Sequence, residues 1–144
     1  NRQQYFVDQL GLPKVDALKE NLRRINPYVQ AATLFGKVNR DNIPHIFKDV
    51  DVLVEAFDAA DQKAMLVESF RKHFPGTPLV AASGLAGFES ANSVTTRKIG
   101  RNFYLAGDGE TGAEPGRGLM APRVGVAAHH QANAVLRLLL GEEP

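Results

Sequence analysis

Asp58 is the residue of this 144-residue sequence whose type and position point most directly to chemistry. It follows residues 50–57, a nearly continuous apolar run that predicts a strand buried on both faces, as in a parallel sheet. Ligands of open α/β sheets bind outside the carboxyl ends of the strands. A carboxylate there can hold Mg²⁺, which prefers oxygen ligands and bridges to substrate phosphates. The same carboxylate can instead cap the following helix, and position alone supports the cap at least as well.

Arg2, Gln3 and Lys14 form a second group of candidates. Arginine forks onto phosphate oxygens, and lysine supplies a point charge. Two cations beside a nucleotide triphosphate would offset its negative charge as pyrophosphate leaves. From composition alone, a solvated N-terminal tail and an ordinary surface lysine explain these residues better.

Residues 107–112 match the pattern Gly-x-Gly-x-x-Gly after a predicted strand. We interpret them as a connector and not as a dinucleotide loop, for two reasons. Pro115 prevents a helix from following, and Asp108 and Glu110 would repel a phosphate.

The four histidines do not form a metal-binding pattern. His129 and His130 are adjacent, so on a helix they point about 100° apart. His45 and His73 lie on amphipathic segments without a companion ligand. We therefore expect all four to be structural or surface residues.

Composition excludes some classes of function. Cysteine is absent, which excludes a disulfide, a thiolate zinc site and a cysteine nucleophile in this chain. The net charge of +1 gives no support to a general nucleic-acid or membrane-surface role. No apolar run is long enough to span a bilayer. We expect a cytoplasmic protein.

The elements that must position these residues follow from periodicity and from turn signals. The predicted helices are residues 13–25, a short one capped by Asp41 or Asn42 and ending at Phe47, residues 60–74, and a last one from Pro122 or Val124 to Leu140. The predicted strands are residues 28–35, 50–57, 79–82, 94–98 and 102–106. The strand, helix and strand from 50 to 82 make a parallel crossover unit, whereas the last two strands should pair antiparallel. We interpret the glycine-rich residues 107–119 as a mobile loop. The fold class is α/β, in a single domain over 1–144.

Several short strings, taken together in their order and spacing, resemble one enzyme family. They cover essentially the whole chain and are Asn1–Gln4, Gly11–Lys14, Arg24–Pro27, Glu55–Asp58 followed by Lys63, Ala82–Gly87, and Gly118–Arg123. The first resembles the end of the Asn-Leu-x-Arg-Gln motif of ubiquitin-activating and sulfur-carrier-activating enzymes. The second resembles their Gly-x-Pro-Lys motif. The last two resemble most closely the thiamine-biosynthesis branch, the ThiF-like enzymes.

The resemblance implies a Rossmann-like fold of the ubiquitin-activating-enzyme type and an adenylyltransferase activity. The enzyme would use ATP and Mg²⁺ to adenylate the C-terminal glycine of a ubiquitin-like sulfur-carrier protein ending in Gly-Gly. Thiamine thiazole synthesis is favoured, with molybdopterin synthesis next, and a homodimer is expected. By resemblance, Arg2 and Lys14 would contact the ATP phosphates, Gln3 would position the nucleotide or the carboxylate, and Asp58 would hold Mg²⁺. Arg2 and Asp58 are the catalytic candidates.

Two departures from the family pattern lead to further expectations. The family's glycine-rich nucleotide loop and its acidic ribose-binding residue would lie before Asn1. The chain therefore looks like the C-terminal part of an adenylating domain, and we expect it to bind ATP weakly or not at all, and to be inactive, when isolated. Without cysteine it also has neither the zinc-binding pairs nor the sulfur-transfer cysteine of many relatives.

Two other functions fit parts of the pattern. A nicotinamide-dependent dehydrogenase fits the sheet pattern equally well, and some relatives act as non-catalytic binding subunits. Arg2, Lys14 and Asp58 favour adenylation over both, because phosphate and metal chemistry needs them and hydride transfer does not.

Overall fold

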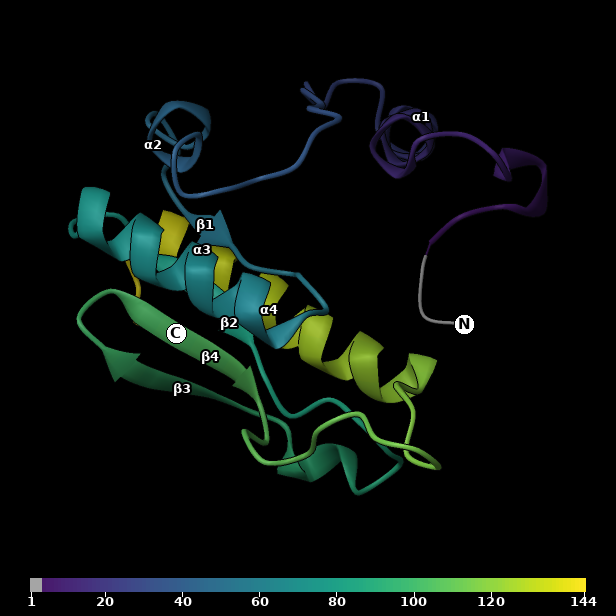
Figure 1. Cartoon of the computed structure of the whole chain (residues 1–144), viewed down its shortest axis with the longest axis vertical. Helices are drawn as coiled ribbons and strands as arrows, with labels where there is room; N and C mark the ends of the chain where they lie inside the picture. Colours follow the sequence, from purple (N-terminus) through teal and green to yellow (C-terminus); the bar gives the residue numbers. More distant parts are fainter. Residues whose placement is uncertain (1–3) are drawn as a thin grey trace. The chain divides into compact units, whose positions relative to one another are not determined.

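The computed structural model describes residues 4–144 (Figure 1). Arg2 and Gln3 lie outside the described residues. The chain divides into two compact units, one within residues 3–37 and one covering Val38–Pro144, and each is described by itself. The expectation of a single domain over 1–144 stays a prediction.

The smaller unit is built around α1 (Lys14–Ile25), which follows Pro13 as predicted. A 3-10 turn, Val7–Gln9, precedes it. Gln9 and Asn21 are buried and exchange two side-chain hydrogen bonds, of 2.7 and 3.1 Å. This reciprocal pair satisfies polar groups that would otherwise be costly to bury.

The strand predicted over residues 28–35 is wrong. The structure has no regular element between α1 and α2 (Ile43–Ile46). A strand needs a partner for its backbone groups, and the described sheet contains only four later segments. β-prone residues without a sheet edge beside them therefore remain irregular.

The larger unit holds a four-stranded sheet with the order β1-β2-β4-β3. The strands are β1 (Leu53–Val54), β2 (Leu79–Ala82), β3 (Thr95–Gly100) and β4 (Phe103–Gly107). β1 and β4 both run parallel to β2, and β3 runs antiparallel to β4. The helices are α2, α3 (Ala60–His73) and α4 (Ala121–Leu139), with a 3-10 turn at Ala91–Ser93. None of the described helices combines the length and apolarity needed to cross a membrane.

Successive side chains of β2 point to opposite faces of the sheet, and a helix packs on each face. Leu79 and Ala81 belong to a core cluster with Phe70 of α3. Val80 packs on the other face, in a cluster with Ala134 of α4. This is the α/β arrangement that the sequence predicted, with a parallel crossover unit, an antiparallel hairpin and a C-terminal helix.

Most predicted boundaries hold within a few residues, and β1 is the main difference. Only two residues of the predicted run 50–57 form a strand. The ladder ends at Glu55, whose side chain turns back to accept a hydrogen bond from the backbone N–H of Phe57 (2.6 Å). Asn42 precedes α2 as expected, but its side chain makes no cap bond to that helix.

The sequence did not reveal that β4 would run parallel to β2. Because β1, β2 and β4 share one direction, their carboxyl ends meet at one edge of the sheet. The segments that leave this edge are the turn through Asp58, the segment from Ser83 and the glycine-rich loop after Gly107. A site at this edge can therefore draw on three separate stretches of sequence.

Candidate functional site

A pocket of about 370 Å³ lies at the carboxyl edge of the sheet. Three stretches line it, and they follow β1, β2 and β4 in turn, with one further residue next to α4. The lining residues are Phe57, Asp58, Ala60, Lys63, Ala82, Ser83, Gly84, Leu85, Thr111, Gly112, Ala113 and Leu119.

Asp58 lines this pocket as an exposed residue between β1 and α3. The N-cap of α3 is Ala59, and no side chain caps that helix. The capping role, which position alone supported, is therefore not observed. Within residues 4–144 no hydrogen bond or ion pair to the Asp58 carboxylate is seen, so this carboxylate is open to a ligand.

Lys63 and Glu55 form an ion pair at the end of β1, in which Glu55 is buried and Lys63 is 26% exposed. The Glu55 side chain is 1% exposed, and Lys63 Nζ lies 3.0 Å from each of its carboxylate oxygens. Lys63 also donates to the backbone carbonyl of Ala82, at the end of β2 (3.2 Å). The pair thus ties the ends of β1 and β2 to α3 and fixes the turn that carries Asp58.

Sequence reasoning cited Lys63 only through the family resemblance and gave Glu55 no role. A usable signal was present, because Glu55 is a charged residue inside a strand pattern that predicts burial on both faces. Buried charges are normally paired, so a lysine eight positions later on the next helix was the natural partner.

Asp108 anchors the first turn of the glycine-rich loop. Its carboxylate accepts hydrogen bonds from the backbone N–H groups of Glu110 (2.8 Å) and Thr111 (2.9 Å) and from the Thr111 hydroxyl (2.8 Å). It also pairs with the Arg123 guanidinium at 2.5 Å. Burial acts to raise the pKa of Asp108, but these hydrogen bonds outweigh it and lower the pKa from 3.8 to about 2.

This geometry agrees with the interpretation of residues 107–112 as a connector. The backbone amides that would face a phosphate in a dinucleotide loop are occupied here by the chain's own carboxylate. The loop was expected to be mobile, and its first turn is tied down by Asp108.

Arg123, in the first turn of α4, is the second functional candidate that sequence reasoning missed. Its side chain is 3% exposed and donates to the backbone carbonyls of Glu89 and Ser90, each at 3.0 Å, and to the Ser93 hydroxyl at 3.1 Å. With Asp108, it joins α4 to two separate loops. The signal for it was an arginine beside the apolar start of a predicted helix.

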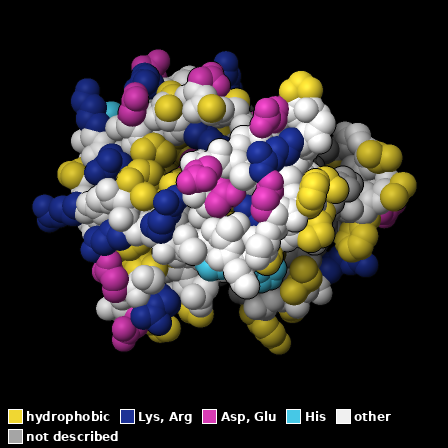
Figure 2. Space-filling model, turned by 90° about the horizontal axis from the view of Figure 1, so that it is seen from below, with side chains coloured by type: hydrophobic (Ala, Val, Ile, Leu, Met, Phe, Trp, Pro, Cys, Tyr) yellow, Lys and Arg dark blue, Asp and Glu magenta, His cyan; other side chains and the backbone are white. Residues whose placement is uncertain are grey.

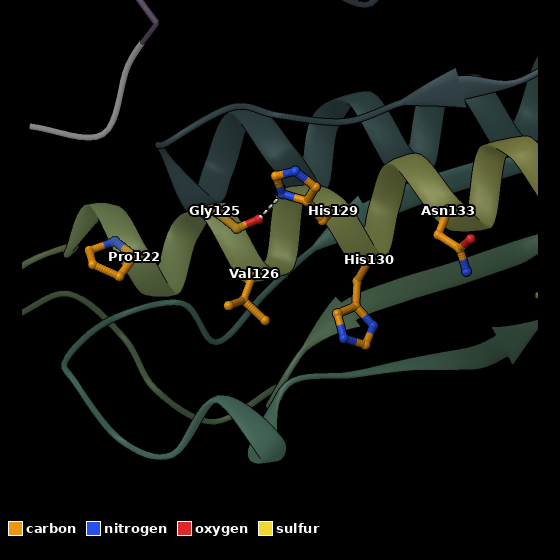
Figure 3. Close-up of a pocket in the computed structure, with 6 residues that line it drawn as sticks. All are labelled: Pro122, Gly125, Val126, His129, His130 and Asn133. Carbon is orange, nitrogen blue, oxygen red and sulfur yellow. Dashed lines mark hydrogen bonds between the residues drawn. The ribbon is translucent and has the colours of Figure 1, made fainter.

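A larger hollow of about 630 Å³ runs along one face of α4 (Figure 3). His129 and His130 both line it but point in different directions, as predicted for neighbours on a helix. His129 Nδ1 lies 2.7 Å from the Gly125 carbonyl oxygen, and His130 Nδ1 lies 3.0 Å from the Thr96 hydroxyl. In the part of the chain that the structure describes, no three His, Cys, Asp or Glu residues cluster to hold a metal.

Lys14 belongs to the smaller unit, where it is exposed at the first position of α1. Asp58 belongs to the larger unit, and Arg2 and Gln3 are not described. The gathering of these four residues around one nucleotide therefore stays a prediction.

Comparison with known proteins identifies a family. The model of the ThiF family matches residues 1–144. "Adenylyltransferase and sulfurtransferase UBA4" of Kluyveromyces lactis is 26% identical over 138 residues, which cover 92% of this chain and 31% of UBA4. "Protein HesA" of Leptolyngbya boryana is 30% identical over 70 residues, which cover 48% of this chain and 25% of HesA. The chain thus spans a third or less of these relatives.

Solved structures show the same fold. The E. coli tRNA N6-threonylcarbamoyladenosine dehydratase TcdA, in complex with ATP, superposes with a TM-score of 0.81 at 18% identity, covering 94% of this chain and 67% of TcdA. A second TcdA structure superposes at 0.82 and 19% identity, over 98% of this chain and 70% of TcdA.

Proposed function

The chain belongs to the ThiF family, and we propose that the protein adenylates the C-terminal glycine of a ubiquitin-like sulfur-carrier protein with ATP. The observation that carries the proposal is the open Asp58 carboxylate in a pocket at the carboxyl edge of the sheet. The relative UBA4 is by name an adenylyltransferase and sulfurtransferase, which supports the same reaction class.

The reaction requires orientation and charge stabilisation more than a protein nucleophile. The C-terminal carboxylate of the carrier attacks the α-phosphorus of ATP. A carboxyl–phosphate bond forms, the bond to the β-phosphate breaks, and pyrophosphate leaves with its electron pair. In this proposal Arg2 and Lys14 offset the phosphate charge, and Gln3 positions the nucleotide or the attacking carboxylate.

Asp58 fits a Mg²⁺ ion that reaches the protein together with ATP. Magnesium is usually bound by one or two carboxylates plus substrate phosphates and water, so an all-protein cage is not needed. Asp58 supplies one exposed carboxylate without a competing protein donor in the described chain. When bound, Mg²⁺ neutralises charge that builds up on the leaving pyrophosphate. The Glu55–Lys63 pair holds the Asp58 turn in place.

The choice of carrier protein rests on short sequence motifs. Residues 82–87 and 118–123 favour a carrier of thiamine thiazole synthesis. We also propose that the protein works as a homodimer in the cytoplasm, where ATP and small carrier proteins are available.

Pyrophosphate exchange tests the proposal. The full-length protein should exchange labelled pyrophosphate into ATP only when a small protein ending in Gly-Gly is added. Asp58→Asn should reduce exchange by at least about 100-fold, since one metal-bound carboxylate supports several kcal/mol of charge stabilisation. Asp51→Asn, at another exposed aspartate just before β1, is the matched control and should exchange normally.

The outcomes separate the alternatives. Normal exchange by Asp58→Asn, with an unchanged circular-dichroism spectrum, would remove the magnesium assignment. Exchange activated by tRNA and not by a carrier would favour the kind of substrate that the name of TcdA states. No exchange with either would favour a non-catalytic binding subunit.

A further inference from the structure

Thr111, Gly112 and Ala113 line the pocket and belong to the loop after β4, far in sequence from the Asp58 turn. We call residues 108–113 the loop wall. We propose that the ion pair of Asp108 and Arg123 is a positioning latch that holds the loop wall and thereby sets how well the carrier's C-terminal carboxylate enters the pocket. The proposal rests on the proposed function for its kinetic consequence but not for its structural one.

The carboxylate of Asp108 organises the loop wall from within. It binds two successive backbone amides and the Thr111 hydroxyl, so its loss would release three donors at once. Gly112 and Ala113 are exposed and carry almost no side chain, so their own side chains do little to fix the wall. Loop segments with few buried apolar contacts open at low free-energy cost unless polar contacts hold them.

Backbone hydrogen bonds tie the loop wall to the end of β2. Backbone N–H groups of Asp108 and Gly109 donate to the carbonyls of Gly84 and Ser83, both at 3.2 Å. Gly84 has φ of +78°, and a Cβ there would collide with the Asp108 carboxylate. Only glycine combines this backbone conformation with this close approach. Ser83 and Gly84 line the same pocket, so these bonds join two of the segments that line it.

Arg123 is itself held in place by backbone contacts. Its guanidinium is held by the carbonyls of Glu89 and Ser90 as well as by Asp108. A second arginine, Arg97 of β3, donates to the backbone carbonyl of Asp108 at 3.2 Å. Removing Asp108 would leave the buried guanidinium with only the Glu89 carboxylate, 4.0 Å from its Nε, as a counter-charge, which is unfavourable.

The Asp58 turn is held independently. It depends on Glu55 and Lys63, which make no hydrogen bond or ion pair with Asp108 or Arg123 within residues 4–144. Loss of the latch should therefore affect entry of the carrier far more than the binding of ATP and metal. This separation makes a positioning role measurable, because a general loss of structure would change both KM values.

The test uses Asp108→Ala in the full-length protein. Exchange of the Glu110 and Thr111 amide hydrogens should become at least about tenfold faster, which corresponds to the loss of one net hydrogen bond. KM for the carrier should rise about tenfold, while KM for ATP stays within about twofold. Millimolar formate should restore both properties, since it can occupy the space and the charge of the missing carboxylate.

Asp51→Ala is the matched control. It removes an exposed carboxylate just before β1, outside the pocket lining. It should leave amide exchange and both KM values unchanged and show no response to formate. Asp108→Asn, which keeps the side-chain shape, serves in the same assays if the alanine variant does not fold.

Each result decides the proposal. Unchanged amide exchange in the Asp108 variant overturns the latch. Faster exchange with an unchanged carrier KM, or with an equal rise in both KM values, overturns its positioning role. If the wild-type protein itself shows no carrier-dependent pyrophosphate exchange, the proposed function fails, while the amide-exchange measurement still tests the latch.

Discussion

Asp108 illustrates how the fold changes the chemistry of one residue. From the sequence alone, it was interpreted as a charge that would repel a phosphate from the glycine-rich motif. In the structure, four donors converge on its carboxylate and lower its pKa from 3.8 to about 2. The native state therefore favours the ionised form, and protonation must weaken it.

The lowered pKa of Asp108 predicts a specific loss of stability in acid. Because the folded pKa is below the unfolded value, the unfolded chain binds the proton first as the pH falls. The contribution is present above about pH 4 and is lost towards about pH 2. Allowing for solvent screening, we expect it to be on the order of 1 kcal/mol.

Urea unfolding checks this prediction. The stability difference between wild type and Asp108→Asn should shrink between about pH 5.5 and about pH 2.5. Asp51→Asn, at an exposed aspartate before β1, is the control for the loss of a carboxylate elsewhere in the chain. A difference for Asp108→Asn that is independent of pH would contradict the assigned pKa.

At the scale of elements, the Glu55–Lys63 pair connects β1, β2 and α3 at the edge where the pocket lies. α4 joins the same place, because Gln131 donates to the backbone carbonyl of Glu55 at 3.0 Å. The short β1 is thus extended by side-chain contacts beyond its two ladder residues. Polar contacts replace backbone pairing at the point where the chain must turn towards the site.

This pair predicts a strong energetic coupling between β1 and α3. Lys63→Met should lower the free energy of unfolding by about 3–5 kcal/mol, because it leaves the buried Glu55 carboxylate without a counter-charge. Adding Glu55→Gln should recover part of that loss, which gives a coupling of about 0.5–3 kcal/mol in a double-mutant cycle. Chemical denaturation of the four proteins measures it.

The exposed ion pair of Arg40 and Glu68 is the control for this cycle. It also involves α3, but its side chains are 59% and 64% exposed. Exposed pairs contribute about 0–1 kcal/mol, so Arg40→Met should have little effect. Additive effects of Lys63→Met and Glu55→Gln would show that the buried pair does not link the elements.

At the scale of the whole molecule, the surface carries both charge signs. Figure 2 shows acidic and basic side chains interspersed on one face of the molecule. This mixture gives no support to a broad electrostatic surface for nucleic acid on that face. Three leucines at the end of α4 are exposed by 55–70%: Leu136, Leu139 and Leu140.

These leucines lead to a prediction about assembly. Clustered exposed apolar side chains often mark protein interfaces, so we expect them to contribute to the proposed homodimer. Leu136→Glu combined with Leu139→Glu should convert the dimer to a monomer in sedimentation equilibrium, because glutamates would be buried without partners. Ile99→Glu, on the exposed end of β3, should leave the dimer intact. A monomeric wild type, or a dimer in the double variant, would refute this interface.

The sequence by itself determined the local elements. Helical spacing with its breakers located α1, α3 and α4, and a continuous apolar run located β2, because these signals act over neighbouring residues. It also led to the family, since short motifs carry their spacing with them. Asp58 lines the pocket at the edge of the sheet, and its role there stays a prediction.

Only the tertiary structure decided which segments meet. Whether residues 28–35 find a sheet edge, and whether β4 lies parallel beside β2, depends on pairings between distant segments that local patterns do not encode. The same holds for Asp108 with Arg123, whose charges are 15 residues apart in sequence and meet only when β4 and α4 pack together. A buried ion pair is stable through the three-dimensional arrangement of its donors, so its presence is a property of the fold and not of either residue.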